Sequence, residues 1–188
     1  MRIISGNFKG KKIHQPLDKN TRPLRDMVKE SIFNLLVHSK KINFEILNSN
    51  VLDLFSGSGS FGLECVSRGA NQVIFVENYF NIINILKRNV KSIDLDNVCK
   101  IVEKDCFDYF KINTYFQNKF DLIFIDPPYK EKKINSLIDE IKKNKILNNN
   151  GIIIIHRHKK EKDNFPEKFK IIEEKKYGIS KIIFGKFI

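Results

Sequence analysis

The stretch VLDLFSGSGSFGLE, residues 51–64, decides the fold. It begins as a short apolar strand, and Gly57, Gly59 and Gly62 follow with the spacing G-x-G-x-x-G before the apolar start of a helix. Glycines at these places permit a tight turn and let the backbone approach a bound ligand closely. The stretch therefore predicts a strand, a ligand-binding turn and a helix, which together open an α/β sheet.

Asp53 lies at the end of this predicted strand, ahead of the glycines. A carboxylate in that place would repel a pyrophosphate and attract a cation. The amino group and the sulfonium of S-adenosylmethionine are such cations, so Asp53 favours a methyl-donor site over a dinucleotide site. The other interpretation of the glycine spacing is an ordinary strand, turn and helix with small residues in the turn and no ligand site.

Composition sets the class of protein. The 188 residues fit one domain, and the net charge of +12 with a pI of about 9.5 favours an anionic partner, first of all a nucleic acid. The Lys-, Asn- and Ile-rich composition of an AT-rich coding sequence would also explain part of this charge. We expect a soluble protein, because no apolar run is long enough for a membrane span. Three cysteines without a pairing pattern indicate the reducing cytoplasm. We expect neither a disulfide framework nor a metal site, because of the spacing of Cys65, Cys99, Cys106 and the four histidines.

The rest of the chain alternates strands and helices. Strands are expected at 51–55, 73–77, 99–103, 120–126 and 151–156, followed by an antiparallel pair at 169–177 and 180–187. Helices are expected near 27–38, 60–68, 80–93, 106–110 and 134–144. This alternation predicts a Rossmann-like, seven-stranded α/β fold in one domain.

Four acidic residues fall at or just after the ends of successive strands: Asp53, Glu77, Asp105 and Asp126. Ligands of such sheets bind outside the carboxyl ends of the strands. Glu77 follows Gly57 by 20 residues, where an acid can accept hydrogen bonds from both ribose hydroxyls of an adenosine. Asp105 either meets an adenine amino group or caps the helix that follows it.

The sequence Asp126-Pro127-Pro128-Tyr129 favours S-adenosylmethionine over a dinucleotide as the cofactor. Two prolines after a buried strand hold the backbone extended and remove two N–H donors. A planar base could stack on Tyr129 while its exocyclic amine donates to the Asp126 carboxylate and the Pro127 carbonyl. Holding both amine hydrogens in this way frees the nitrogen lone pair to attack a sulfonium methyl group, by positioning and preorganised dipoles.

Residues 1–15 predict a β-hairpin that turns near residue 9, within a basic arm of residues 1–20 that precedes a catalytic core of residues 21–188. The functional interpretation is an arm that contacts RNA phosphates, and the alternative is a solvated hairpin. Its basic residues are Arg2, Lys9, Lys11 and Lys12.

Four segments together resemble one family. DLFSGSGSFGLE (53–64) followed by DPPY (126–129) is typical of methyltransferases that act on amino groups of nucleic-acid bases. RIISGNFKGKKI (2–13) and TRPLRDMVKESIFN (21–34) extend the resemblance over nearly the whole chain. The chain looks like the RsmD family, which methylates the exocyclic N2 amine of one guanine in 16S ribosomal RNA of the small subunit.

The resemblance implies a Rossmann-like S-adenosylmethionine-dependent methyltransferase fold with a small N-terminal hairpin extension, and S-adenosylmethionine as the cofactor. It implies that four residues bind the target amine, namely Asp126, Pro127, Pro128 and Tyr129. It implies a cofactor pocket that comprises, with Asp53, the residues Ser56, Gly57, Gly59, Glu77 and Asp105. Thr21, Arg22 and Pro23 would close near that pocket.

The chain departs from the family in two places. The family usually has Arg-Pro-Thr after its basic arm, and here Leu24 stands at the place of the threonine, so a hydroxyl contact is lost. The fifth strand of the family tends to end in a glutamate, and here it ends in His156-Arg157-His158. We interpret these three residues as a basic strand end that faces RNA; titration of the two histidines near neutral pH is the alternative.

The leading hypothesis is a monomeric guanine-N2 methyltransferase that recognises the folded shape of a partly assembled small subunit, with phosphates held by the arm, Arg25, Lys29 and the basic tail. A DNA adenine-N6 methyltransferase is the first alternative, but the chain leaves little room for a DNA-recognition domain. An NAD-dependent oxidoreductase leaves the prolines and Tyr129 unexplained. An RNA-binding module without catalysis leaves Asp53 and Asp126 unexplained.

Overall fold

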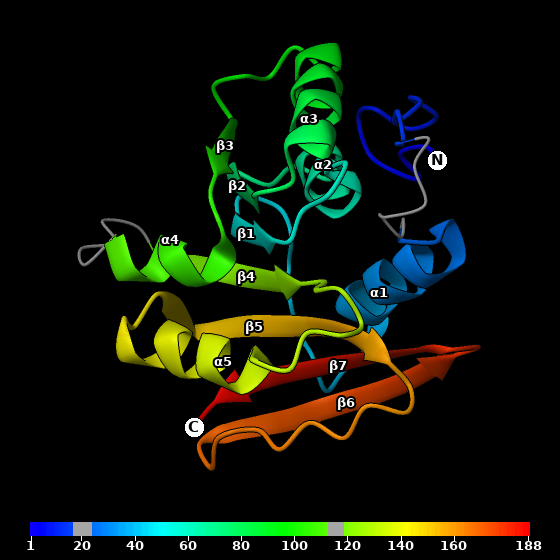
Figure 1. Ribbon diagram of the computed structural model, residues 1–188. Helices are drawn as coiled ribbons and strands as arrows, with labels where there is room; N and C mark the ends of the chain where they lie inside the picture. The colour runs from blue at the N-terminus through cyan, green and yellow to red at the C-terminus, as the bar shows by residue number, and fades with distance from the viewer. Residues whose placement is uncertain (17–23, 113–118) are drawn as a thin grey trace.

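A seven-stranded sheet covered by helices on both faces forms the body of the protein in the computed structural model, which describes residues 1–16, 24–112 and 119–188 (Figure 1). The helices are α1 Asp26–His38, α2 Ser60–Ser67, α3 Phe80–Ser92, α4 Cys106–Ile112 and α5 Ile134–Lys143. The strands are β1 Asn50–Leu54, β2 Gln72–Glu77, β3 Cys99–Glu103, β4 Phe120–Ile125, β5 Leu147–His158, β6 Phe169–Tyr177 and β7 Ser180–Phe187. The predicted Rossmann-like α/β fold is confirmed.

The strand order is β3-β2-β1-β4-β5-β7-β6. Strands β1 to β5 are parallel, and β7 runs antiparallel to both β5 and β6. The chain leaves β1 towards β2 and β3, and later returns to the other side of β1 with β4. The switch point therefore lies between β1 and β4, where a sheet of this kind opens a crevice at its carboxyl edge.

Strand β5 begins four residues before the expected start at residue 151. Phe120 pairs with Leu147, and the register shifts before Leu122 pairs with Ile152. The added residues include the polar run Asn148–Asn150, whose side chains are partly or fully exposed. An apolar pattern could not detect this part of the strand, because none of its three asparagines is buried.

Two clusters of buried apolar side chains join the sheet to its helices, one on each face. Helices α1, α2 and α3 pack on one face, where Phe61 stacks between Phe33 and Phe124 at centroid distances of 5.2 and 3.9 Å. Helices α4 and α5 pack on the other face against a second cluster that includes Ile123, Ile125 and Ile153. Apolar residues on both sides of β4 explain why its sequence is hydrophobic almost throughout.

The N-terminal segment folds back on itself, as expected, but as one isolated antiparallel bridge between Arg2 and Lys12 rather than a regular hairpin. The Ile3 N–H donates to the Lys11 carbonyl at 2.9 Å, and the Gly10 N–H donates to the Ile3 carbonyl at 2.8 Å. Ile3 and Ile13 are buried in the same core cluster as α1 and α2. The arm is therefore packed on the body of the protein.

Glu64 of α2 anchors this arm. Its carboxylate accepts the Ile4 N–H at 2.7 Å and the Ser5 N–H at 3.0 Å. It also lies 3.6 Å from Lys29 Nζ and accepts the Arg68 Nε–H at 2.9 Å. Glu64 and Lys29 are both fully buried, and burial lowers the pKa of Lys29 while Glu64 opposes that shift. The expectation that Lys29 contacts RNA phosphates is therefore wrong, because its ammonium group is enclosed in this anchor.

Candidate active site

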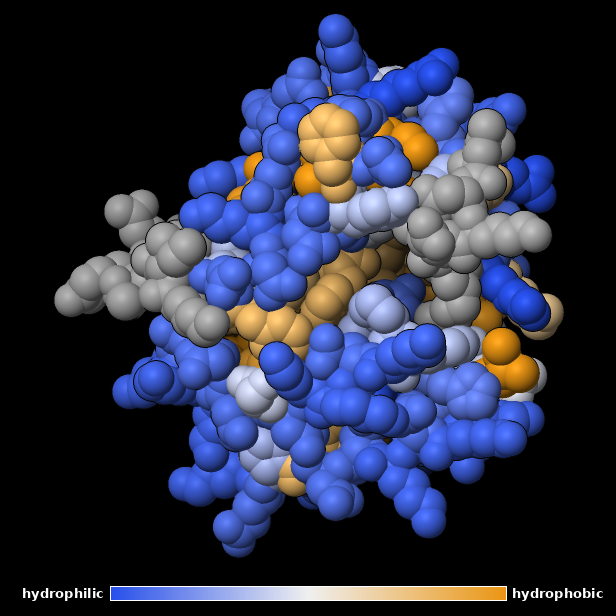
Figure 2. Space-filling view, in the orientation of Figure 1, coloured by the Kyte–Doolittle hydropathy of each residue, from blue (hydrophilic) through white to orange (hydrophobic). Residues whose placement is uncertain are grey.

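A cavity of about 420 Å³ lies at the carboxyl edge of β1, β2 and β4. Figure 2 shows a hollow with hydrophobic side chains near the middle of an otherwise mostly hydrophilic face. The volume is within the range of small-molecule sites. Its lining combines polar and apolar residues: Gln15, Pro16, Leu24, Asp53, Phe55, Ser56, Gly57, Ser58, Ser60, Phe61, Glu77, Asn78, Tyr79, Ile82, Phe124, Asp126, Pro127, Pro128 and Tyr129.

The glycine turn forms one wall, and its glycines serve different purposes. Gly57 has φ +54°, and a Cβ added there would meet nothing within 4 Å, so its backbone borders open space. Gly59 has φ +80°, and a Cβ added there would lie 2.5 Å from Leu86 Cδ1. Gly57 therefore lines the cavity, whereas Gly59 lies outside the lining and allows the turn to pack against α3.

Asp53 is the most buried polar residue of the cavity lining. It is 1% exposed, and its Oδ2 accepts the Gly62 N–H at 3.0 Å. Burial raises the pKa of Asp53 well above its ordinary value, the carboxylates of Asp126 and Glu77 raise it further, and the hydrogen bond from Gly62 opposes the shift. A cationic ligand beside Asp53 would relieve this cost.

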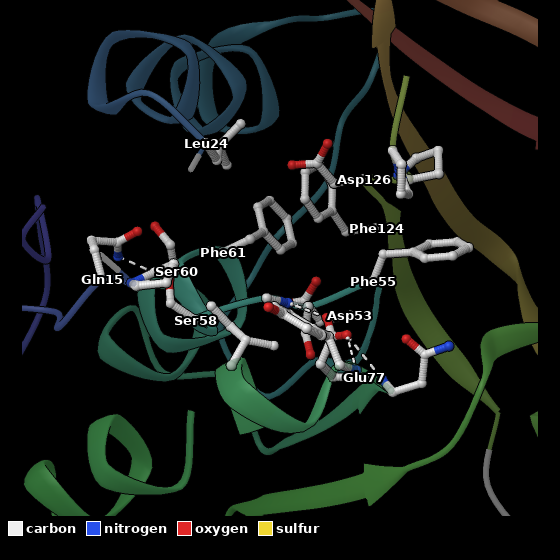
Figure 3. Close-up of a pocket in the computed structure, with 18 of the residues that line it drawn as sticks. Gln15, Leu24, Asp53, Phe55, Ser58, Ser60, Phe61, Glu77, Phe124 and Asp126 are labelled. Atoms are coloured by element: carbon white, nitrogen blue, oxygen red, sulfur yellow. Dashed lines mark hydrogen bonds between the residues drawn. The ribbon is translucent and has the colours of Figure 1, made fainter. Parts of the chain in front are cut away.

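Glu77 lies next to Asp53 in the cavity, with Asp126 across from them (Figure 3). Its Oε2 accepts the Gly57 N–H at 2.8 Å, and its Oε1 accepts the N–H groups of Asn78 and Tyr79, each at 2.9 Å. These bonds fix the carboxylate against the glycine turn. Because each carboxylate oxygen has two lone pairs, Glu77 Oε2 can accept one further hydrogen bond from a ligand hydroxyl.

Asp105 does not line the cavity. Its Oδ1 accepts the Phe107 N–H at 2.8 Å at the start of α4, and its Oδ2 accepts from Asn78 Nδ2 at 2.9 Å. Of the two roles open to it, the structure shows the helix cap. Asn78, which Asp105 orients, is the residue that borders the cavity at this place.

The segment 126–129 begins directly after β4, as expected. The Asp126 N–H donates to the Leu54 carbonyl at 3.3 Å, which continues the pairing with β1 by one bond. Pro127 is buried, Pro128 is exposed, and Tyr129 is half-buried with its ring edge-on to that of His158, at a centroid distance of 5.0 Å and an interplanar angle of 79°. All four residues of the segment border the cavity.

The end of β5 was interpreted wrongly from the sequence. His156 and Arg157 are each 1% exposed, so they are not a basic surface that faces RNA. His156 Nδ1 lies 2.8 Å from Asp126 Oδ1. Arg157 pairs with Asp163 at 3.1 Å, and its Nη2 donates to the Glu131 carbonyl at 2.9 Å. Both side chains thus hold the loop that follows β4.

The basic residues assigned to RNA contact lie away from the cavity lining. All five are exposed: Arg2, Lys9, Lys11, Lys12 and Arg25. Lys11 donates to the Ser92 carbonyl at the end of α3, so the arm also contacts that helix. Thr21, Arg22 and Pro23, expected to close near the cofactor, lie outside the described residues.

The sequence analysis did not identify several lining residues. Phe55 adopts φ +58°, a left-handed conformation that is unfavourable for a bulky side chain and costs of order 1–3 kcal/mol. The surrounding structure must hold Phe55 in this conformation, at the cavity and directly before the glycine turn. Gln15 donates to Ser58 Oγ at 2.8 Å, which places the end of the arm beside the turn. Phe55 could have been suggested by its place after β1, but no local pattern shows that Gln15 returns to the site.

Within the described ranges, no group of three or more His, Cys, Asp or Glu side chains is arranged to hold a metal ion. Among those same residues, no helix is long and apolar enough to cross a membrane.

Comparisons with known proteins agree with this architecture. A family model described as "Conserved hypothetical protein 95" matches residues 1–186. The chain is 32% identical to the ribosomal RNA small subunit methyltransferase D of Haemophilus influenzae, over 95% of this chain and 90% of that protein. It is 34% identical to the protein of the same name from Buchnera aphidicola, over 92% and 86%. The solved structure of yhhF from Escherichia coli has a TM-score of 0.81 and 23% identity, covering 100% of this chain and 97% of that one, which shows the same fold.

Proposed function

The chain belongs to the RsmD family, described as Conserved hypothetical protein 95, and from this premise we propose that it methylates the exocyclic N2 amine of a guanine in 16S ribosomal RNA, with S-adenosylmethionine as methyl donor. The observation that carries the proposal is one cavity bordered by Asp53 and Glu77 on one side and by the segment 126–129 on the other. The names of the two relatives support ribosomal RNA as the substrate.

The cavity fits the methyl donor by its chemistry. Asp53 is a buried carboxylate whose ionised form needs a cation, and the donor carries an amino group and a sulfonium. Glu77 Oε2 can accept a hydrogen bond from a ribose hydroxyl, and Tyr79 and Ile82 offer an apolar surface for the adenine. The arrangement is that expected at the switch point of a doubly wound sheet.

The residues of the segment 126–129 would position the acceptor. Tyr129 offers a ring for the base, which must leave its stack to reach the cavity. Asp126 and the Pro127 carbonyl would accept the two amine hydrogens, so that the nitrogen lone pair points at the methyl group. S-adenosylmethionine supplies that methyl group, its S–CH3 bond breaking as the N–CH3 bond forms and its positive charge passing to the amine. The methylated amine then loses one proton to Asp126 or to water.

Incubation with labelled methyl donor tests this proposal. We expect label in ribosomal RNA, and digestion to nucleosides should give N2-methylguanosine. Separate reactions with naked 16S RNA, a partly assembled small subunit and DNA identify the substrate. We expect faster transfer to the particle, because a single domain has little surface for recognising RNA by sequence alone. Label on DNA adenine, or no transfer to any of the three, would overturn the proposal.

Asp53→Asn should stabilise the ligand-free protein and weaken binding of the methyl donor. The native state holds the Asp53 proton more tightly than the unfolded chain does, so the contribution of Asp53 to stability falls as pH rises through its raised native pKa. At neutral pH the amide should therefore raise the unfolding free energy by about 1 kcal/mol. Thermal melting between pH 5 and 8 and calorimetric titration with the donor measure the two effects. Asp139→Asn, on the exposed side of α5, should change neither.

Neutralising the arm should weaken RNA binding without affecting the donor. In the double variant Lys9→Gln with Lys12→Gln, two exposed cations are lost. Each lost phosphate contact should lower the slope of log affinity against log salt by about 1. Fluorescence titration of RNA at several salt concentrations measures the slope. Lys143→Gln, whose side chain is 78% exposed on α5, is the matched control and should leave the slope unchanged. An unaltered slope in the arm variant would show that the arm does not bind phosphates.

A further inference from the structure

A chain of polar contacts runs behind the segment 126–129 and joins its two ends. Asp126 Oδ1 lies 2.8 Å from His156 Nδ1, and His156 Nε2 lies 2.9 Å from Ser180 Oγ. Ser180 Oγ in turn lies 3.5 Å from the Tyr129 hydroxyl. The contacts therefore lead from the carboxylate to the aromatic hydroxyl through two buried side chains that are not part of the segment.

The sheet fixes the two middle members of this chain. His156 is on β5 and Ser180 opens β7, the antiparallel neighbour of β5 (Figure 1). Ser180 pairs with His158, two residues beyond His156, so Ser180 and His156 lie diagonally on one face of the sheet. His156 is 1% exposed and Ser180 is 4% exposed. Their positions are thus set by strand pairing rather than by a loop.

With an ionised Asp126 and a neutral imidazole at His156, the contacts define the direction of each proton. An ionised Asp126 can only accept, so His156 Nδ1 must carry the hydrogen that bridges them. In a neutral imidazole the other nitrogen is then an acceptor, and Ser180 must donate its hydroxyl hydrogen to His156 Nε2. Ser180 Oγ can still accept from the Tyr129 hydroxyl. Every donor in the chain therefore points towards the Asp126 carboxylate.

The same three residue types form the catalytic triad of serine hydrolases, where the serine attacks the substrate. Here the carboxylate, and not the serine, is the member of the three that a ligand can reach. Asp126 borders the cavity, whereas Ser180 is buried and is absent from the lining. The group that meets a ligand is therefore the carboxylate, and the imidazole and hydroxyl lie behind it.

We infer that His156 is a positioning residue for methyl transfer: its Nδ1–H holds the Asp126 carboxylate in one orientation, and Ser180 holds the imidazole in the tautomer that this requires. The inference rests on the proposed function and adds a residue to its machinery. Each carboxylate oxygen has two lone pairs, so the bond from His156 leaves Asp126 able to accept the substrate amine. The Tyr129 hydroxyl lies 3.5 Å from Ser180 Oγ, farther than an ordinary O–H···O hydrogen bond, so the chain of short contacts ends at Ser180.

Two substitutions at residue 156 separate positioning from packing. In His156→Asn the side-chain amide can take the place of Nδ1 and still donate to Asp126. In His156→Gln the amide reaches the place of Nε2, and no donor remains at Nδ1, although glutamine is closer to histidine in volume. We expect the single-turnover rate to fall about 100-fold in the Gln variant and about tenfold in the Asn variant, since a small misplacement of a reacting group has effects of this size. Packing alone would give the opposite order.

Three further measurements complete the test. The affinity for the methyl donor, measured by calorimetry, should stay within about twofold of the wild-type value in both variants. The substitutions would then affect the rate of transfer and not the binding of the donor. His38→Gln, at the exposed end of α1, should keep the wild-type rate. ¹⁵N NMR of labelled histidine should show one Nδ1–H tautomer in the wild-type protein, lost in His156→Gln and altered in Ser180→Ala.

The outcomes are distinct for the two proposals. Suppose that the wild-type protein transfers the methyl group to guanine. Unchanged rates in both variants, or a faster Gln variant than Asn variant, would then overturn the inference and leave the proposed function standing. Absence of wild-type transfer would overturn the proposed function. If wild-type transfer is absent, the NMR spectrum still tests the contact between His156 and Asp126. A spectrum without the Nδ1–H tautomer of His156 would overturn the inference as well. A spectrum with this tautomer would support only the orientation of Asp126 by His156.

Discussion

Replacing Asp126 by alanine should slow turnover strongly while leaving the affinity for the methyl donor nearly unchanged. The variant removes the acceptor that orients the target amine, and loss of one preorganised group of this kind lowers the rate by about 10²- to 10³-fold. The donor should bind at least as well as before, because the Asp126 carboxylate is one of the charges that raise the pKa of Asp53. Single-turnover assays measure the rate, and calorimetric titration measures donor affinity.

Asp126→Asn is the matched control. The alanine variant leaves the buried imidazole of His156 without this acceptor, and an unsatisfied buried polar group costs about 1–3 kcal/mol of stability. Asparagine keeps an acceptor oxygen at a similar place, so it should fold with nearly wild-type stability and still be slow, because the charge is lost. If either variant modified RNA at the wild-type rate, Asp126 would not act on the amine.

Replacing Glu64 by glutamine should destabilise the protein strongly. Glu64 lies beside the fully buried ammonium group of Lys29, and it accepts two N–H groups of the arm. Removing one partner of a buried ion pair costs about 3–5 kcal/mol, because the other charge remains buried. Urea denaturation measures the loss. Limited proteolysis should show earlier cleavage of residues 1–16, since their anchor is weakened.

The double variant Glu64→Gln with Lys29→Met tests the cause. Removal of both charges should recover part of the lost stability, because the buried ammonium group that has lost its Glu64 partner is then removed as well. Lys29→Met alone should cost less than Glu64→Gln alone, since Arg68 and the two arm amides still satisfy Glu64. Glu167→Gln, an exposed carboxylate, should have no measurable effect. An additive double variant would show that the Lys29–Glu64 pair contributes nothing as a pair.

The sheet and the acidic edge of the site could be predicted from the sequence because both depend on local order. Continuous apolar runs mark buried parallel strands, and residues at or just after the carboxyl ends of such strands must meet at one edge. Asp53, Glu77 and Asp126 follow this rule, and the structure places all three around the cavity. Asp105 follows the same rule in sequence, but its side chain turns back to cap α4.

The roles of basic residues could not be predicted in the same way. Lys29, His156 and Arg157 look like solvent-facing charge in the sequence, but each is buried against acceptors from distant segments. Arg157, for example, reaches the Glu131 carbonyl 26 residues away in the chain. Pairing of this kind depends on tertiary packing, which neither periodicity nor net charge reports. The contribution of Gln15 depends likewise on the path of the arm.

The strand order leaves β3 and β6 as the two outer strands of the sheet. An outer strand offers unpaired backbone groups to which another polypeptide can add. Both strands carry charged side chains, with exposed Lys100 and Glu103 on β3 and exposed Lys175 and Lys176 on β6. Burying these charges between two copies would be costly, so the sheet should not extend from one molecule to the next. The same lysines that make the chain basic thus help to keep it from aggregating at high concentration.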